Sequence, residues 1–375
     1  MKRFLKKIFC YITIVVLLLS CGDAKVRFHA VDGEVVPMHY SSLLSIVECD
    51  GYTVVDVANP WGDGIMQRYI LVPSAVELPT NLPAGLLLRT PLENTILFSG
   101  VHAGLLGELG VVKSIKGVCD AQYFYCDAVA DGLAAGAVVN CGSSLNVDAE
   151  AVVQVSPDAV FVLPYENGGF GKLDNLGFPL VLCADYMESS PLGCAEWMRF
   201  YGRLFGLAAE SDSLFSVVCS EYEALENAAN NVGYRPKLMC ELKSTSAWYV
   251  PCGESCMGRM YTDAGADYLF SFCKGSGSVP LSYEVVLDNA VDADVWLLKY
   301  NSDVDRTRES LLADFAGYLH FKPFKQHNIY ACNTRYRHLF EETAFHPERL
   351  LKELVAIFHP ELLTDYTLQY YEKMR

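Results

Sequence analysis

The sequence has few basic residues for its length. Its 375 residues include 29 Lys and Arg against 45 Asp and Glu, which gives a formal net charge of −16. The densest basic group lies at the very start and comprises Lys2, Arg3, Lys6 and Lys7. Proteins that bind nucleic acid need a basic surface to neutralise phosphates, so we do not expect a nucleic-acid partner. With 51% apolar and only 20% charged residues, the body of the chain is expected to be compact.

The sequence also lacks the short motifs of several enzyme classes. It contains neither a G-x-S-x-G elbow, which holds a hydrolase nucleophile, nor an H-E-x-x-H zinc motif. Gly171-Lys172 resembles the end of a phosphate-binding loop, but Glu166 stands where that loop needs Gly, and Leu173 stands where it needs Ser or Thr. Gly275-Ser276-Gly277 lacks the third glycine of a dinucleotide-binding turn. We therefore expect that the protein is not an enzyme.

Cysteine is plentiful, with 14 residues, but C-x-x-C spacing is absent. The closest pair, Cys252 and Cys256, is separated by three residues, whereas redox and zinc motifs usually have two between their cysteines. No second pair of Cys or His follows at a suitable distance, so neither a metal site nor a cofactor is expected. Most other cysteines lie in apolar runs and are expected to be buried. A disulfide between Cys252 and Cys256 stays open, because an exported chain meets an oxidising environment.

One apolar run stands out, at residues 8–19. It follows a basic start and precedes Leu-Leu-Ser-Cys, and it is too short to span a bilayer well. Residues 1–21 resemble a bacterial lipoprotein signal, which would be cut before Cys21 so that this cysteine carries a lipid. The expected location is the cell envelope, with the chain lipid-anchored on the periplasmic side of a membrane. The alternative is an uncleaved membrane helix in which Cys21 has no role.

The rest of the chain divides into segments that differ in their pattern of apolar and polar residues. Residues 22–91 are rich in alternating strands; residues 45–58, for example, alternate around a turn at Asp50-Gly51. Residues 92–208 then alternate short apolar strands with helices, as do residues 234–375. Continuous apolar strands between helices are typical of parallel sheets that are covered on both faces.

A long helix is predicted between the two alternating regions, at residues 209–233. Ser211-Asp212 is a possible N-cap, and apolar residues recur at intervals of three and four up to Leu225. The predicted fold class is therefore α/β, with two Rossmann-like lobes around central parallel sheets, joined by a single long helix and preceded by a β-rich extension.

Several short motifs occur in an order that resembles one known family. They are Asn146-Val147-Asp148-Ala149-Glu150, Ser156-Pro157-Asp158-Ala159-Val160, Leu176-Gly177-Phe178-Pro179, Ser282-Tyr283-Glu284-Val285-Val286, Asp292-Ala293-Asp294-Val295 and His346-Pro347-Glu348-Arg349-Leu350-Leu351. The chain resembles the helical-linker class (class III) of periplasmic substrate-binding proteins, which serve ABC importers of ferric siderophores, haem and cobalamin. The resemblance covers about residues 92–360, and the β-rich extension lies outside it. That extension could cover a lobe, alter the cleft or touch another protein.

The resemblance implies a ligand site between the lobes, formed by loops at the carboxyl ends of the strands. Aromatic residues in these loops suit a flat or apolar ligand, and arginines suit an anionic chelate. The expected ligand-binding residues are His102, Tyr165, Phe170, Tyr186, Trp248, Tyr249, Met257, Arg259 and Arg335.

Each of these residues also has an ordinary structural interpretation. His102 begins a helix, so it could be a packed or capping side chain, and Met257 could pack within its helix. Trp248 and Tyr249 are consecutive in a strand, so we expect one of them in the core and only the other in the cleft. Arg259 could pair with Asp263 one turn further on.

The family likeness also implies one exposed glutamate on each lobe, which docks onto arginines of the membrane permease. Glu284 matches the position in the second lobe, and Glu166 is the best match in the first, with Glu188 as a competitor. Both could also be ordinary solvated glutamates.

The expected function is that of a lipid-anchored binding component of an ABC importer. As a monomer, it would capture an iron chelate or cobalamin between two lobes and deliver it to the permease and its ATPase. The alternatives are a structural lipoprotein that docks through its β-rich extension, or a protein that processes a metal chelate, for which no acid/base constellation is found.

Overall fold

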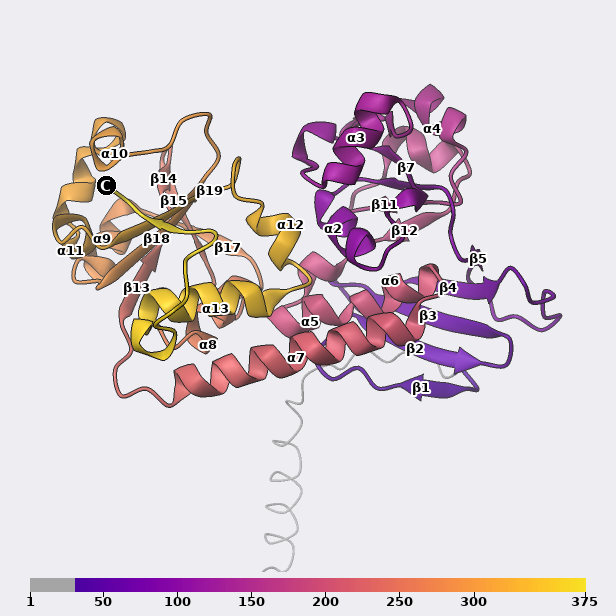
Figure 1. The fold of residues 1–375 in the computed structure, drawn as a ribbon, viewed down its shortest axis with the longest axis horizontal. Coiled ribbons are helices and arrows are strands. Elements are labelled where there is room, and N and C mark those ends of the chain that lie inside the picture. Colours follow the sequence, from indigo (N-terminus) through magenta and orange to yellow (C-terminus); the bar gives the residue numbers. More distant parts are fainter. Residues whose placement is uncertain (1–30) are drawn as a thin grey trace, which may run out of the picture.

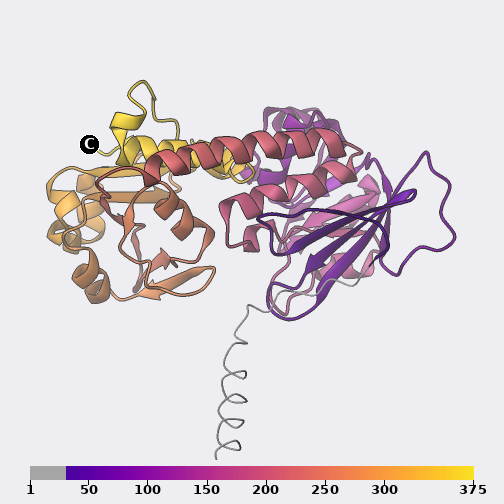
Figure 2. The same cartoon turned by 90° about the horizontal axis from the view of Figure 1, so that it is seen from below.

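The computed structural model describes residues 31–375, so the signal segment and Cys21 lie outside the described residues. Two α/β lobes lie side by side, and one long helix runs along both of them (Figures 1 and 2). A separate antiparallel sheet, formed by the first strands of the described chain, packs beside the first lobe. The predicted fold class, with two parallel sheets, a helical link and a β-rich extension, is confirmed.

The first lobe is built on a five-stranded parallel sheet of order β12-β11-β6-β7-β8. Its central strand β6 and the neighbouring β11 are buried along their whole length, because helices and loops cover both faces of the sheet. The strands are β6 (Thr95–Leu97), β7 (Ile115–Val118), β8 (Val139–Asn140), β11 (Ala159–Val162) and β12 (Leu180–Leu182), with a small hairpin of β9 (Gly142–Ser143) and β10 (Asn146–Val147). The helices are α2 (Gly100–Glu108), α3 (Asp127–Ala135) and α4 (Ala149–Val155).

The second lobe repeats this plan with the order β16-β13-β18-β19-β20, in which only β20 is antiparallel. A three-stranded antiparallel sheet flanks it. The main strands are β13 (Lys237–Cys240), β16 (Asp267–Tyr268), β18 (Val295–Tyr300), β19 (Ile329–Asn333) and β20 (Glu372–Lys373), and the flanking strands are β14 (Lys243–Ser244), β15 (Ala247–Pro251) and β17 (Ser278–Leu281). The helices are α8 (Cys256–Asp263), α9 (Tyr283–Ala290), α10 (Arg308–Asp314), α11 (Lys322–Lys325), α12 (Leu339–Thr343) and α13 (Pro347–Phe358).

The linking helix α7 (Ala208–Asn230) follows two short helices, α5 (Pro191–Glu196) and α6 (Met198–Leu204). It begins within one residue of the predicted 209 and ends three residues before the predicted 233, but Ser211 and Asp212 are not its cap, since the N-cap is Leu207. Ser211 is buried in the first turn, and the Asp212 carboxylate pairs with Arg199 and Arg203 of α6 at 2.9 Å. These ion pairs join α7 to the helix before it.

The β-rich extension is an integral part of the first lobe. Its sheet runs β1 (Glu34–Val36), β2 (Leu44–Cys49), β3 (Tyr52–Ala58), β4 (Ile65–Pro73) and β5 (Leu86–Thr90), antiparallel except for the β4–β5 pair. The buried Tyr69 hydroxyl accepts a hydrogen bond from the Leu182 backbone N–H at 2.7 Å and donates to the Leu180 carbonyl at 3.2 Å. Because β12 is an edge strand, these two backbone groups have no neighbouring strand to pair with, and the Tyr69 hydroxyl satisfies them instead.

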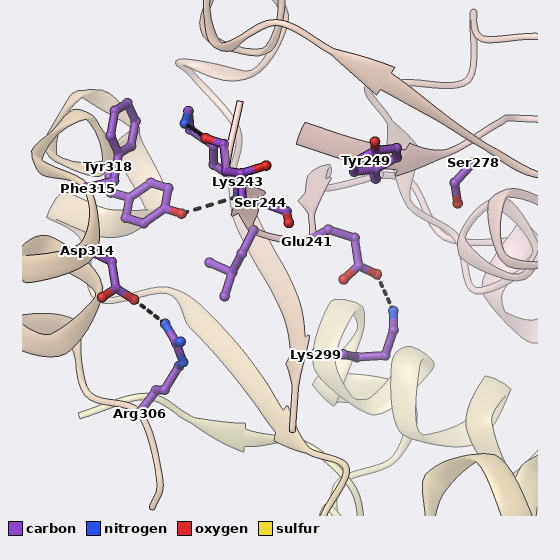
Figure 3. A pocket seen from close by; sticks show the side chains of 12 residues that line it. Glu241, Lys243, Ser244, Tyr249, Ser278, Lys299, Arg306, Asp314, Phe315 and Tyr318 are labelled. Atoms are coloured by element: carbon purple, nitrogen blue, oxygen red, sulfur yellow. Dashed lines mark hydrogen bonds and ion pairs between the residues drawn. The ribbon is translucent and has the colours of Figure 1, made fainter. Parts of the chain in front are cut away.

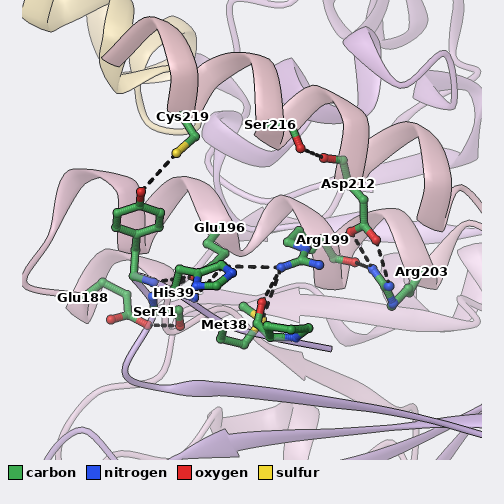
Figure 4. Close-up of polar contacts among 12 residues, drawn as sticks. Met38, His39, Ser41, Glu188, Glu196, Arg199, Arg203, Asp212, Ser216 and Cys219 are labelled. Carbon is green, nitrogen blue, oxygen red and sulfur yellow. Dashed lines mark hydrogen bonds and ion pairs between the residues drawn. The ribbon is translucent and has the colours of Figure 1, made fainter. Parts of the chain in front are cut away.

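Two buried glutamates hold the chain between β1 and β2 (Figure 4). Glu196 accepts the backbone N–H groups of residues 39, 40 and 41 at 2.8 to 3.0 Å. Glu188 accepts the N–H groups of residues 42 and 43 at 3.0 Å and the indole N–H of Trp197, also at 3.0 Å. We call this contact between the two glutamates and residues 39–43 the carboxylate clamp.

Candidate functional site

A cavity of about 550 Å³ lies between the two lobes, and its lining is mostly apolar. The first lobe contributes its wall from Ser99, Val101, His102, Leu163, Pro164, Tyr165, Asp185, Tyr186, Pro191 and Cys194. The second lobe contributes Cys256, Met257, Met260, Lys299, Leu339, Phe340, Thr343, Ala344, Pro347, Leu350 and Tyr371. No residue of 31–91 lines it, so the extension supports the first lobe without altering the cavity.

The first-lobe wall is formed where strands end, as open α/β sheets require. His102 lies in the first turn of α2 directly after β6, and the loops after β11 and β12 carry Tyr165 and Tyr186. The Tyr186 hydroxyl donates to the Pro164 carbonyl, which ties these two loops together. The aromatic rings are about half exposed, so both are available to a ligand.

Beneath this wall lies a buried polar cluster. His102 Nε2 is 3.3 Å from Asp185 Oδ1 and 3.3 Å from the Tyr201 hydroxyl, which donates to Asp185 Oδ1 at 2.5 Å. Burial disfavours a charged imidazole, but the neighbouring acidic groups Cys183 and Asp185 outweigh burial and raise the pKa of His102 to about 10. The cluster therefore places a charged pair at the floor of an otherwise apolar cavity.

Four of the nine predicted ligand-binding residues line the cavity: His102, Tyr165, Tyr186 and Met257. The prediction for Trp248 is corrected, because this side chain is fully buried against Trp296 and Phe321 and its indole N–H donates to the Cys240 carbonyl. Of the strand pair, Tyr249 is the exposed member, but it does not line this cavity either.

The other three predicted residues also lie away from the cavity. Phe170 packs against a buried apolar cluster of the first lobe that includes Val160 and Leu173. Arg259 is exposed on α8, and the exposed Arg335 pairs with Asp303 at 2.7 Å on the surface of the second lobe. None of the three lines the cavity, so we leave them out of the candidate site.

Sequence reasoning missed most of the second-lobe wall. Leu339, Phe340, Pro347 and Leu350 come from α12 and α13. The apolar periodicity of α13 was visible in the sequence, but it does not show which part of the apolar face meets a cavity. Two thiols far apart in sequence also meet here, with Cys194 Sγ 3.9 Å from Cys256 Sγ.

The open question of a Cys252–Cys256 pair is answered for this structure. All cysteines in the described part of the chain are free thiols. Cys252 is buried and its thiol donates to the Lys274 carbonyl, whereas Cys256 lines the cavity. The two side chains therefore have different surroundings.

A second hollow, of about 620 Å³, lies within the second lobe and is more polar (Figure 3). Four of its five charged residues are paired with one another, Lys299 with Glu241 and Arg306 with Asp314 at 2.5 Å, and the fifth, Lys243, donates to the Thr245 carbonyl. Lys299 lines both hollows. Of these two hollows, the apolar cavity is the one with walls from both lobes, and we take that cavity as the candidate site.

Helix α12 of the second lobe contacts the first lobe beside the cavity. The Glu341 carboxylate accepts the N–H groups of Tyr125 and Cys126 at 3.1 and 3.3 Å, and the Tyr125 ring stacks on His338. A Cβ at Gly104 would lie 2.9 Å from the Glu341 carbonyl oxygen, so this close approach of α2 and α12 requires glycine. We call these contacts, together with the ion pair from His346 to Glu108 at 2.6 Å, the inter-lobe latch.

The latch is expected to weaken as the pH rises above neutrality. Burial raises the pKa of Glu341 from 4.5 to about 7, so the latched state holds a proton that a free carboxyl loses between these values. Burial would lower the pKa of His346, but Glu108 and Glu348 outweigh it and raise this pKa above 6.5. Both groups bind more protons when latched. The stabilisation from Glu341 is complete below pH 4.5 and is lost as the pH rises to about 7, whereas that from His346 is complete below pH 6.5 and is lost at higher pH, so the latch is weakest above neutrality.

Small-angle scattering between pH 6 and 9 should therefore show an increasing radius of gyration. The double variant Glu341→Gln with His346→Gln is the control, because neither amide titrates, and its radius should not change with pH. An equal pH dependence in both proteins would show that other groups control the lobes.

The predicted docking glutamates lie on different lobes. Glu166 is exposed in the loop after β11, and Glu284 is exposed in the first turn of α9. The competing residue, Glu188, is buried in the carboxylate clamp and is not available on the surface. Nothing among the described helices has both the length and the hydropathy needed to cross a membrane.

Comparison with known proteins agrees with this geometry. The pattern of the periplasmic binding protein family matches residues 98–336. An uncharacterized lipoprotein of Methanocaldococcus jannaschii is 26% identical over 298 residues, which are 76% of this chain and 70% of that protein. A second uncharacterized lipoprotein of the same organism is 24% identical over 351 residues, covering 87% of this chain and 83% of that protein.

Solved structures share the fold at lower identity. The apo periplasmic heme-binding protein RhuT from Roseiflexus sp. RS-1 has a TM-score of 0.56 and 20% identity, covering 72% of this chain and 98% of that one. The periplasmic vitamin B12 binding protein BtuF of Vibrio cholerae has a TM-score of 0.53 and 12% identity, covering 74% of this chain and 99% of that one. With its matching pattern and its two lobes on one long helix, the chain belongs to the periplasmic binding protein family, in the helical-linker class.

Proposed function

We propose that this protein is the lipid-anchored binding component of an ABC importer, and that it captures a metal chelate or cobalamin between its lobes and releases it unchanged. The observation that carries this proposal is the apolar cavity between the lobes, with half-exposed Tyr165 and Tyr186 at its wall. An apolar cavity with a few polar groups is typical of small-molecule sites.

The lining favours one ligand class within this range. Among residues 31–375, no arginine lines the cavity, and its lysine, Lys299, is paired with Glu241. A highly anionic ferric siderophore would therefore find no free cationic partner there, and a buried charge without a partner is strongly disfavoured. A flat, largely apolar macrocycle such as haem fits the tyrosines, the methionines and Phe340 better.

Lipid attachment at Cys21 is part of the proposal and is supported by the signal-like segment and by the two lipoprotein relatives. It would place the protein on the periplasmic side of a membrane, where it can reach the permease and its ATPase. We propose that it acts there as a monomer.

Titration of intrinsic tryptophan fluorescence with haem, cobalamin and a ferric siderophore tests the function. Trp197 is buried among the aromatic residues behind the cavity, close to Tyr201, and should report occupancy. Saturable binding of one compound, recovered chemically unchanged, is the expected result. Failure of all three to bind would instead favour a structural lipoprotein, and a changed product would favour an enzyme.

Glu166 and Glu284 are proposed to dock onto the permease, one from each lobe. Replacing both with lysine should lower ligand uptake by cells that carry the importer at least about tenfold, because like charges across an interface cost several kcal/mol. The affinity for ligand in solution should not change, since neither residue lines the cavity. The exposed Glu210→Lys serves as the control. Normal uptake in the double variant would remove these residues from the interface.

A further inference from the structure

Three buried side chains at the floor of the cavity present different metal-binding atoms to one another. They are His102, Cys183 and Asp185, and one nitrogen, one sulfur and one carboxylate oxygen lie within 4.8 Å of one another. Two of them follow β12 and the third follows β6, which is the neighbour of β11 in the sheet. The sheet therefore brings together residues that have no recognisable ligand spacing in the sequence.

The separation of these atoms suits a small tetrahedral cation. His102 Nε2 and Asp185 Oδ1 are 3.3 Å apart. Two ligand atoms of a tetrahedral Zn²⁺ site with bonds of about 2.0 to 2.1 Å are also about 3.3 Å apart. Imidazole, thiolate and carboxylate are all ligands that zinc takes. One thiolate and one carboxylate also balance a divalent charge, so the complex would be neutral, as a buried site requires.

The surroundings of these atoms also suit a bound cation. His102 Nε2 is the ring nitrogen that faces Asp185 and is taken as the ligand atom, whereas the buried Nδ1 has no hydrogen-bond partner among the described residues and is not part of the site. The Tyr201 hydroxyl donates to Asp185 at 2.5 Å, which is the kind of outer contact that orients a ligating carboxylate. Both His102 and Asp185 line the cavity, which gives a cation a route of entry and leaves a coordination position open on that side.

We propose that His102, Cys183 and Asp185 form a binding site for one divalent cation of the zinc class on the cavity floor. The cation replaces the protons that these groups otherwise share. Its open position faces the space between the lobes, so a donor atom of a cavity ligand can complete the coordination. The site belongs to the chain itself and does not depend on the identity of the transported ligand.

Titration of the full-length protein with Co²⁺, a spectroscopic substitute for Zn²⁺, tests this site. We expect a thiolate-to-cobalt charge-transfer band in the near ultraviolet and intense visible bands of tetrahedral cobalt, saturating at one cobalt per chain. Addition of Zn²⁺ should remove both signals by displacement. This measurement requires no transport ligand, so its outcome is separate from that of the proposed function.

Matched cysteine variants identify the ligand. Cys183→Ser should remove the charge-transfer band and weaken Co²⁺ binding at least about tenfold, since even loss of an outer-shell partner has effects of this size. Cys194→Ser changes another thiol of the same cavity and should keep the band, as should Cys119→Ser, which changes a thiol buried elsewhere in the first lobe.

His102→Gln and Asp185→Asn should weaken binding without removing the band, and circular dichroism checks that each variant is folded. If Co²⁺ gives no charge-transfer band, or if the band survives in folded Cys183→Ser, the proposal is wrong. If the band is lost in Cys194→Ser instead, the thiolate belongs to the Cys194–Cys256 contact and the assigned site is likewise wrong.

Discussion

Replacing Leu163 with glutamate is expected to remove most ligand binding and to leave the fold intact. Leu163 follows β11 and lines the cavity, yet its side chain is 38% exposed in the free protein. A carboxylate there stays hydrated until a ligand covers it. Burying it without a partner then costs at least about 2 kcal/mol, which corresponds to a loss of roughly 30-fold in affinity.

The measurement is a binding isotherm with whichever of haem, cobalamin or siderophore binds the unchanged protein. Leu145→Glu is the matched control, because Leu145 is 95% exposed in the turn between β9 and β10 and does not line the cavity. Both variants should unfold within about 0.5 kcal/mol of the parent, as is usual for surface substitutions. Equal affinities for the two variants would show that the ligand does not cover this wall.

Glu196→Ala is expected to cause the largest loss of stability. This carboxylate is fully buried, accepts three backbone N–H groups of residues 39–41 and contacts Arg199 at 3.4 Å. Its removal leaves three backbone donors without their partner and takes away one of the two carboxylates that pair with Arg199, which keeps Asp212. Breaking a buried charged network of this kind costs about 3–5 kcal/mol.

Urea unfolding followed by circular dichroism measures this loss, and limited proteolysis locates it. We expect new cleavage within residues 37–43, where the carboxylate clamp is lost. Glu196→Gln should be intermediate, because the amide oxygen still accepts hydrogen bonds, and the exposed Glu210→Ala should change little. A stable Glu196→Ala protein without new cleavage would show that the clamp does not hold the extension.

The clamp also explains why an extension outside the family pattern matters for the site. Glu188 and Glu196 lie at the start and end of the segment that contains α5, and Cys194 of this helix lines the cavity. Residues 39–43 therefore hold the first-lobe wall from behind. A less stable clamp is expected to loosen that wall before the rest of the lobe unfolds.

Sequence reasoning placed residues at the candidate cavity where position along a strand decides exposure. His102, Tyr165 and Tyr186 follow strand ends, and such loops meet at the same edge of a parallel sheet. Trp248 lies away from the cavity, because strand alternation says that neighbours face opposite ways but does not say which face is covered. Arg335 also lies away from it, and its partner Asp303 is in another loop.

The sequence by itself determined the α/β lobes, the long helix between them and the strand ends that line the candidate cavity. These features depend on local periodicity, which a single chain displays directly. Only the tertiary structure decided which side chains meet: Cys183 with His102, Glu196 with residues 39–41, and α12 with α2. Such contacts join residues that are far apart along the chain, and their geometry depends on how whole elements pack.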